Sequence, residues 1–287
     1  MFARIRHTFG SLRRPRASFE RDSRPVVTYA ALGRAGRLGN QMFQIAAAIG
    51  AAARSGAVAA FPDWPYSRFF ARPLPSLVVG DAPPTYREPA FSYAPIPKTA
   101  PLNLLGFFQS ERYFAHCAGA VRRQFEPARG ADRHLRRRYG ERRVRRACAI
   151  HVRRGDYVGH RRFAELAAGD YYERAMALMG PRAAFLVFSD DIAWCRDRFR
   201  GPRFVFVEEG DNIEQLFLMT RCDSHIIANS TFSWWGAWLS GRTRIIAPKL
   251  WFAGEYADPA QPFAATPRGY RGFHDTSDLL PARWLRI

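Results

Sequence analysis

The sequence predicts an α/β protein in which helices cover both faces of parallel sheets. From residue 147 onward, short apolar runs alternate with helical stretches, and this alternation is typical of doubly wound parallel sheets. Near the start, residues 26–61 predict a strand, a glycine-containing loop, a helix and a second strand, which is the order of a βαβ unit. Because 287 residues exceed the usual size of one domain, we expect two domains.

The first half of the chain predicts few regular elements. A strand, a helix and a second strand are expected at residues 26–30, 41–56 and 58–61. The helix is expected to end at Gly56, because glycine adopts the left-handed conformation that closes many helices. Residues 62–110 are rich in proline and aromatic residues and indicate ordered loops with little regular structure. A strongly basic helical stretch follows at 122–146, and we place the domain junction near its end.

The second half predicts a regular alternation of strands and helices. Strands are expected at residues 148–152, 184–189, 203–208, 225–228 and 244–248. Helices are expected at residues 170–180, 191–199, 212–222 and 231–239. Ligands of such sheets bind beyond the carboxyl ends of the strands, so the residues that follow each strand are the first candidates for a site.

The chain is strongly basic, with a formal net charge of +19 and a pI near 10.8. This charge suggests an anionic partner, such as a nucleic acid, an anionic membrane surface or a phosphorylated substrate. Nearly all of it comes from arginine, since Lys98 and Lys249 are the only lysines. Together with abundant alanine, this composition also fits a GC-rich genome, which we favour as the source of most of the charge.

The cysteines and the apolar runs indicate a soluble, cytoplasmic protein. Four cysteines lie far apart without a C-x-x-C pair, so a zinc site or a disulfide framework is not expected, and they are predicted to be reduced core residues. No apolar run approaches the roughly 18 residues of a membrane span. The arginine-rich residues 1–24 form a basic tail that is compatible with peripheral contact with an anionic membrane; a solvated tail without that role is the alternative.

A buried strand runs directly into charged residues at His151, Arg153, Arg154 and Asp156. Because a buried strand should not end in two guanidiniums unless they meet a negative group, this motif predicts an anion site. Arg153 is expected to clamp a pyrophosphate in a bidentate manner, and Asp156 is expected to pair with Arg154 and hold the loop. The alternative is a surface cluster of salt bridges.

A second candidate lies between a predicted strand and a predicted helix, at Asn229, Ser230, Thr231 and Phe232. A helix N-terminus offers free backbone N–H groups and the positive end of a dipole, and hydroxyl groups add donors for phosphate oxygens. The alternative is that Ser230 or Thr231 only caps the helix, a role that is compatible with binding phosphate. The tryptophans that follow are expected to pack in the core, with Trp234 and Trp238 on one face.

A third candidate is the glycine loop 36–41, which opens the first helix. Its glycines, Gly39 among them, allow a phosphate or sugar to approach the backbone, and the amides of Asn40 and Gln41 can bond hydroxyls. The spacing does not fit G-x-G-x-x-G.

Two adjacent carboxylates, Asp190 and Asp191, follow another strand. One of them is either an acceptor for the N1 and N2 hydrogens of guanine or a helix cap. No D-x-D motif accompanies them, so we expect arginines and a helix end, and not a metal ion, to neutralise the phosphates.

Four stretches together resemble the α-1,2-fucosyltransferases of glycosyltransferase family 11, in their bacterial form: GRLGNQMFQ, HVRRGDYV, FSDDIAWC and ANSTFSWWGAWL. The resemblance implies a GT-B fold, with two Rossmann-like domains whose parallel sheets face each other across a cleft. It also implies transfer of L-fucose from GDP-β-L-fucose to O2 of a terminal galactose, with inversion and without a metal or other cofactor. Residues 25–145 would form the acceptor domain, and residues 146–287 the domain that binds GDP-fucose.

The resemblance also implies roles for individual residues. Arg153 would hold the pyrophosphate, and Asn40 would lie near the fucose and the acceptor. We therefore expect the catalytic residues to be Arg153, Asn40 and Asp156, while the identity of the base that takes the acceptor proton stays open. The expected contacts to GDP-fucose come from Gly39, Asn40, His151, Arg153, Asp190, Asn229, Ser230, Thr231 and Phe232.

Two other functions are alternatives to fucosyl transfer. One is a GT-B glycosyltransferase that uses another nucleotide sugar. The other is a nucleic-acid-binding protein that would use the basic face of residues 122–146. Such a protein requires aromatic side chains interleaved with basic ones on an exposed surface, whereas most aromatics here lie in apparent strands, core helices and proline-rich loops, so no nucleic-acid partner is expected.

Overall fold

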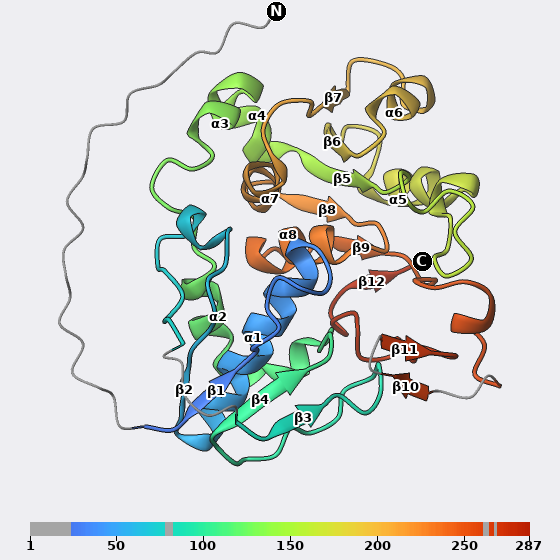
Figure 1. The fold of residues 1–287 in the computed structure, drawn as a ribbon. Coiled ribbons are helices and arrows are strands. Elements are labelled where there is room, and N and C mark those ends of the chain that lie inside the picture. Colours follow the sequence, from blue (N-terminus) through green and yellow to red (C-terminus); the bar gives the residue numbers. More distant parts are fainter. Residues whose placement is uncertain (1–23, 78–82, 261–263, 267–268) are drawn as a thin grey trace, which may run out of the picture.

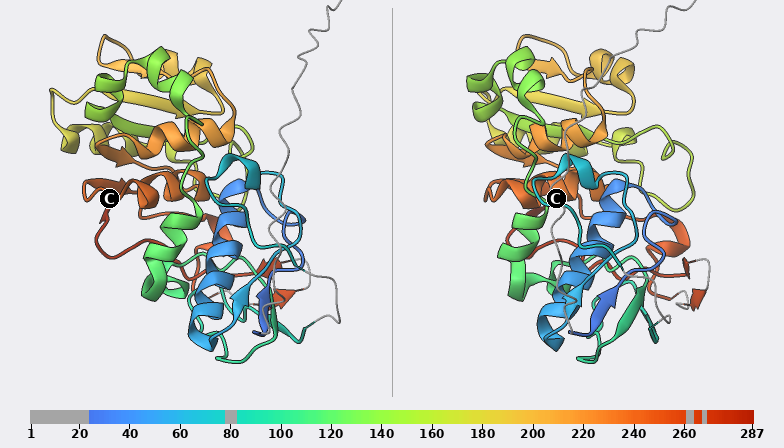
Figure 2. Two further views of the ribbon diagram at one scale, coloured as in Figure 1. Left: turned by 90° about the vertical axis from the view of Figure 1, so that its left-hand side faces the viewer. Right: turned by 60° about the vertical axis from the view of Figure 1, so that its left-hand side comes forward.

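The computed structural model describes residues 24–77, 83–260, 264–266 and 269–287. The chain forms two parallel sheets, each covered by helices, as Figure 1 shows. In both views of Figure 2, the C-terminal half, with its sheet and helices, lies above the N-terminal half. The expected α/β fold with two parallel sheets, the GT-B arrangement, is therefore confirmed.

The N-terminal sheet has four strands, which are β1 (Val26–Thr28), β2 (Val58–Ala59), β3 (Thr85–Arg87) and β4 (Leu102–Leu105). Their order is β2-β1-β4-β3, and all neighbours are parallel. β1 and β2 lie where the sequence predicts them. Residues 62–110 contain little regular structure, as expected, but the two short strands β3 and β4, which the sequence did not predict, lie there and complete the sheet. Both are only three or four residues long, so pairing, of β4 with β1 and of β3 with β4, and not a long apolar run, makes them strands.

Helix α1 (Leu38–Ser55) packs on this sheet and is buried along most of its length. It begins three residues earlier than predicted and ends, as predicted, at Gly56, whose φ is +68°. Gly50 on this helix could not be replaced by a residue with a side chain, because a Cβ at this position would lie 2.1 Å from the carbonyl oxygen of Tyr113. The close approach that Gly50 allows fixes α1 against the loop that follows β4.

The basic stretch that joins the two halves forms three short helices, α2 (Ala118–Gln124), α3 (Arg133–Tyr139) and α4 (Glu141–Arg146). Their arginines face solvent to varying degrees, while Val121, Leu135 and Val144 are fully buried. Apolar side chains at a few positions are therefore enough to dock this stretch. In the described part of the chain, single 3₁₀ turns lie at Ser67–Phe69, Glu111–Tyr113, Ala115–Cys117, Leu166–Ala168 and Gly254–Tyr256.

The C-terminal sheet has six parallel strands, which are β5 (Cys148–Val152), β6 (Phe185–Ser189), β7 (Phe204–Phe206), β8 (Ser224–Ile226), β9 (Ile245–Ala247) and β12 (Leu285–Arg286). The helices between them are α5 (Tyr171–Met179), α6 (Ile192–Arg198), α7 (Asn212–Thr220) and α8 (Thr231–Ser240). Every strand and helix predicted for this half is present. The last strand, β12, was not predicted.

The strand order β12-β9-β8-β5-β6-β7 contains a reversal between β5 and β8. From β5 the chain runs outward through β6 and β7, and it then returns to the other side of β5 to build β8 and β9. The loops after β5 and β8 therefore leave in opposite directions and open a crevice between them. In doubly wound sheets this switch point is where ligands bind.

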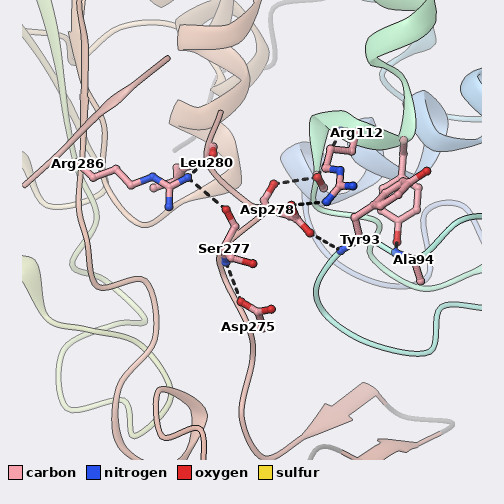
Figure 3. Close-up of polar contacts among 10 residues, drawn as sticks. Tyr93, Ala94, Arg112, Asp275, Ser277, Asp278, Leu280 and Arg286 are labelled. Carbon is pink, nitrogen blue, oxygen red and sulfur yellow. Dashed lines mark hydrogen bonds and ion pairs between the residues drawn. The ribbon is translucent and has the colours of Figure 1, made fainter. Parts of the chain in front are cut away.

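The end of the chain crosses back to the N-terminal half, as Figure 3 shows. Asp278 pairs with Arg112 at 2.8 Å and accepts a hydrogen bond from the backbone nitrogen of Tyr93 at 3.2 Å. Its carbonyl oxygen accepts from the Ser110 hydroxyl at 2.8 Å. This segment follows a short antiparallel pair, β10 (Ala264–Thr266) and β11 (Gly269–Arg271), and precedes β12. The proposed boundary near residue 145 stays a prediction.

The tryptophans of α8 form a core shared by the two halves. Trp234 and Trp238 stack with planes 12° apart, which confirms that they share one face. The indole nitrogen of Trp235 donates to the carbonyl oxygen of Gly39 on α1 at 2.9 Å. All four cysteines are free thiols, and three of them are buried as predicted, while Cys117 is partly exposed. Among the described residues, no helix is both long and apolar enough to cross a membrane.

Candidate functional site

A cavity of about 540 Å³ lies at the switch point of the C-terminal sheet. Its walls come from the loops after β5, β6 and β8 and from the loop and first turn that open α1. It is thus formed by both halves of the molecule. The lining residues that the sequence singled out are Gly39, Asn40, Gln41, His151, Arg153, Asp156, Asp190, Ser230, Thr231 and Phe232.

Arg153 is the charged centre of this cavity. Its side chain is 17% exposed, and its guanidinium pairs with Asp190 at 2.9 Å and with Asp156. Asp156 also pairs with Arg37, from the loop before α1, at 3.2 Å. Two guanidiniums and two carboxylates therefore alternate along one wall, so a phosphate bound there would share Arg153 with these carboxylates.

The predicted pair between Asp156 and Arg154 is wrong. Arg154 pairs instead with Asp191 at 3.1 Å and with Glu165 at 3.8 Å, and its guanidinium lies 4.5 Å from the centre of the Trp194 ring. Successive side chains leaving a strand point to opposite sides, so Arg153 and Arg154 cannot both face the cavity that contains Asp156. Arg154 instead fixes the loop to α6.

The first turns of α1 and α8 abut at the cavity. A Cβ on Gly39 would lie 2.6 Å from the carbonyl carbon and the hydroxyl oxygen of Thr231, so only glycine allows this contact. Neither helix has an acidic residue in its first turn, and neither Arg37 nor Ser230 caps its helix through its side chain. The backbone N–H groups of two helix N-termini, with their positive dipole ends, are therefore directed toward one place.

Asn40 is held in one orientation by a residue that sequence reasoning missed. Its Oδ1 atom accepts a hydrogen bond from Gln109 Nε2 at 2.9 Å. Its Nδ2 atom packs against Gly36, where a Cβ would lie only 2.6 Å from this nitrogen. Gly36 also has a φ of +77°, which favours glycine. Gln41 serves the same loop, because its Nε2 donates to the Gly36 carbonyl at 3.0 Å. The loop is thus fixed so that the Asn40 amide can donate into the cavity.

Glu88 is the second residue that sequence reasoning missed. It is fully buried, and its carboxylate accepts from the backbone nitrogens of Phe107 at 2.7 Å and Phe108 at 2.9 Å, and from the Tyr113 hydroxyl at 3.2 Å. Phe108 adopts a φ of +53°, which is unusual for a residue with a side chain. The carboxylate therefore stabilises the turn that presents Gln109. A single glutamate in a proline-rich loop gave no signal of this role.

His151 lines the cavity as a neutral ring. It is 5% exposed and packs against Phe232, with ring centres 5.3 Å apart. Burial, with a further contribution from the nearby Arg153 charge, lowers the pKa of His151 to about 3. Its Nδ1 atom is buried and has no hydrogen-bond partner among the described residues. A polar atom of a ligand in this cavity is one partner that could satisfy it.

The two adjacent aspartates have different environments. Asp191 caps α6 by accepting from Trp194 N at 3.1 Å, and this bond, with help from Arg154, lowers the pKa of the Asp191 carboxyl. Asp190 faces the cavity and accepts from Arg154 N at 2.9 Å, in addition to its pair with Arg153. The cap interpretation thus describes Asp191, and a guanine contact by Asp190 stays a prediction.

Asn229 does not line this cavity. Its side-chain amide donates to the carbonyl oxygens of Ala164 and Trp251, both at 2.9 Å, so it ties together two loops. Within the part of the chain that the structure describes, no three His, Cys, Asp or Glu side chains gather as metal ligands do.

Comparison with known proteins shows which family the chain belongs to. The model of glycosyl transferase family 11 matches residues 84–265. An α-1,2-colitosyltransferase from Escherichia coli is 33% identical over 200 residues, which are 65% of this chain and 62% of that protein. The O-antigen biosynthesis glycosyltransferase WbnK of Escherichia coli is 36% identical over 118 residues, 37% of this chain and 39% of WbnK.

More distant relatives include an animal enzyme and solved structures. Galactoside α-(1,2)-fucosyltransferase 2 of Oryctolagus cuniculus is 28% identical over 260 residues, 79% of this chain and 70% of that protein. The structure of NodZ α-1,6-fucosyltransferase soaked with GDP-fucose aligns with a TM-score of 0.49 at 16% identity, covering 79% of this chain and 95% of that one. On the family match, which spans more than half of its length, the chain belongs to glycosyltransferase family 11.

Proposed function

We propose that this protein transfers L-fucose from GDP-β-L-fucose to O2 of a terminal galactose, in the assembly of a surface glycan. The observation that carries this proposal is the position of Arg153. It directly follows a buried strand at the switch point, and it lines the same cavity as the first turns of α1 and α8. This is a site for a pyrophosphate, and membership of family 11 indicates which chemistry is done with it.

The charges of the site suit the departure of GDP. In the proposed reaction, O2 of galactose attacks the anomeric carbon of fucose, and the bond between that carbon and the β-phosphate oxygen breaks. Negative charge grows on the phosphate as this happens. Arg153 and the two helix ends would stabilise that charge more in the transition state than in the ground state, and this difference accelerates the reaction.

The polar groups around Arg153 support contacts with the fucose. The Asn40 amide, fixed by Gln109, can donate a hydrogen bond to a sugar oxygen, and His151 Nδ1 lacks a partner among the described residues. The proton of the attacking hydroxyl needs an acceptor. Asp156 is the candidate already considered, and its carboxylate contacts both Arg153 and Arg37. We also propose that no metal ion takes part, because guanidiniums and helix ends supply the positive charge.

The surroundings of the enzyme form a separate part of the proposal. We propose that it works on the cytoplasmic face of a membrane, held loosely by its basic residues 1–24. Nearly all of these residues lie outside the described part of the chain. Because such contact is electrostatic, we expect the enzyme to leave membranes near 1 M salt, where the Debye length falls to about 3 Å. Deleting residues 1–24 should weaken the association and leave GDP affinity unchanged.

The test of the function is a transfer assay with GDP-fucose and a panel of terminal β-galactosides, followed by mass and linkage analysis of the product. We expect a product with fucose on O2 of galactose. A second candidate is the same transfer with colitose in place of fucose, which the α-1,2-colitosyltransferase relative favours. A parallel assay with the colitose donor decides between them by kcat/KM. No transfer from either donor to any galactoside would contradict the proposal.

A further inference from the structure

A second cavity, of about 210 Å³, adjoins the first. The two share the lining residues Gly36, Asn40, Tyr157, Phe163 and Thr231. Beyond this shared wall the second cavity is lined by other segments, and Arg153, Asp156 and Asp190 do not line it. A molecule in the second cavity would therefore meet the sugar of a donor at Asn40, away from the groups proposed to hold the pyrophosphate.

A row of aromatic rings forms one wall of the second cavity. Tyr157 and Phe163 stack with ring centres 4.0 Å apart and planes 1° apart. Phe163 is followed by Phe252 at 5.8 Å, and Phe252 is followed by Phe91 at 5.1 Å. The guanidinium of Arg153 lies 5.5 Å from the centre of the Tyr157 ring, so the row begins beside the proposed phosphate site. It provides a continuous apolar surface that leads away from the donor.

The polar groups of the second cavity are hydrogen-bond donors more than acids. Asn40, Gln109 and Thr231 line it, and none of the described aspartates or glutamates does. Among the described residues, Arg162 is the only arginine or lysine that lines it. Its guanidinium lies 4.6 Å from the centre of the Tyr256 ring, and no carboxylate of the described residues pairs with it. The cavity thus combines aromatic faces with an amide pair and an uncompensated guanidinium.

We propose that the second cavity binds the galactose-terminated acceptor, with the sugar packed against the aromatic row and its oxygens bonded by Arg162 and the Asn40–Gln109 pair. This inference rests on the proposed fucosyl transfer. A pyranose has a face of C–H bonds, which packs on the negative face of an aromatic ring, and a rim of hydroxyls that accept from amides and guanidiniums. Such a mixture of aromatic walls and a few placed donors is typical of sites for small ligands. Inversion requires the acceptor hydroxyl to attack the anomeric carbon from the side opposite the leaving phosphate. An acceptor in the second cavity would approach from there, because Arg153 does not line that cavity.

The test uses one variant from each half of the molecule, Arg162→Gln and Phe107→Leu. Both residues line the second cavity and neither lines the first. The matched control is Arg161→Gln, which removes the same charge one residue away at an exposed position that lines neither cavity. For each variant we would measure the KM for the best galactoside of the panel, and the Kd of GDP by calorimetry. GDP binding also reports whether the variant is folded.

We expect Arg162→Gln to raise the acceptor KM about tenfold or more, and Phe107→Leu to raise it severalfold, because both lose contacts to the acceptor alone. The Kd of GDP should stay within about twofold in both, and Arg161→Gln should match the parent in both measurements. Acceptor KM values that stay near the parent value in an active enzyme would overturn this inference and leave the proposed function intact. So would a loss of GDP affinity as large as the rise in acceptor KM. If the parent enzyme transfers no sugar to any galactoside, the proposed function is wrong and the acceptor assignment falls with it.

Discussion

The two halves of the molecule use the same α/β unit, yet they contribute different kinds of group to the site. The C-terminal sheet is regular, and its strand ends supply the charged residues Arg153, Asp156 and Asp190 directly. The N-terminal sheet has short strands, and its long loops supply Gln109 and the buried Glu88, which hold Asn40 in place. In the proposed reaction, the C-terminal half supplies the charged side chains at the leaving phosphate, and the N-terminal half positions the sugar and adds the N-terminus of α1 at the phosphate.

The largest expected effect comes from the C-terminal half. Arg153→Lys should lower kcat/KM by roughly a hundredfold or more, since a point charge cannot reproduce the planar fork of arginine at a phosphate. The matched control is Arg154→Lys, which should lower it less than about tenfold, because Arg154 faces α6 and not the cavity. Steady-state kinetics with saturating acceptor measure both. Equal losses in the two variants would contradict the assignment of Arg153 as the phosphate ligand.

The next effect tests the supporting role of the N-terminal half. Glu88→Gln replaces one carboxylate oxygen, which accepts hydrogen bonds from backbone N–H groups, with an NH₂ group that is itself a donor. The variant should therefore lower the free energy of unfolding by about 2 kcal/mol. Glu126→Gln, at an exposed position, is the control and should change it little. Urea denaturation followed by tryptophan fluorescence provides the measurement. In the variant that remains folded, kcat should fall more than GDP affinity, because Asn40 loses its orientation. A Glu88→Gln variant as stable and active as the control would contradict the supporting role assigned to Glu88.

The same comparison explains what the sequence could predict. The central strands of the second half are buried on both faces, as in β5, where all five residues are buried, so a short continuous apolar run identifies them. The two-residue strand β12, with one exposed residue, has no such run and was not predicted. β3 is an edge strand with two exposed residues in three, and only its partner β4 makes it a strand. The sequence could therefore predict a site from the charged residues at the strand ends of the second half. It could not predict β3 and β4, the remaining strands of the smaller sheet.

The errors at the site have a common physical origin. The pairing of Asp156 was predicted from closeness in the sequence, but the direction in which Arg153 and Arg154 leave the strand decides their partners. Glu88 bonds atoms 19 and 20 residues away, and Gln109 meets Asn40 across 69 residues. Such contacts exist only after the chain has folded, so no local pattern announces them.

A smaller effect should appear in the dependence of stability on pH. His151 on β5 and His225 on β8 are buried, and burial lowers their pKa values to about 3 and about 4. Between an unfolded pKa near 6.5 and these values, the unfolded chain takes up protons that the folded chain refuses, so stability falls as pH falls. Each histidine should contribute about 1.4 kcal/mol per pH unit near pH 5.

Urea midpoints measured from pH 7 down to pH 5 check this expectation. His225→Gln lies outside the cavity and should reduce the steepness of the decline whatever its effect on stability at pH 7. A decline of unchanged steepness would show that His225 is protonated in the folded protein.

The smallest expected effect is that of a chelator. Turnover should be the same with excess EDTA as with added Mg²⁺ or Mn²⁺, because Arg153 and the first turns of α1 and α8 are proposed to balance the pyrophosphate charge that a metal ion would otherwise balance. Initial rates at several GDP-fucose concentrations measure this, so that a change in donor KM is seen as well as a change in kcat. The result bears on the comparison of the two halves: the N-terminus of α1 belongs to the first half and that of α8 to the second, and Gly39 brings them together. Loss of activity in EDTA with rescue by Mg²⁺ would mean that these helix ends do not balance the charge, and that the first half contributes to positioning alone.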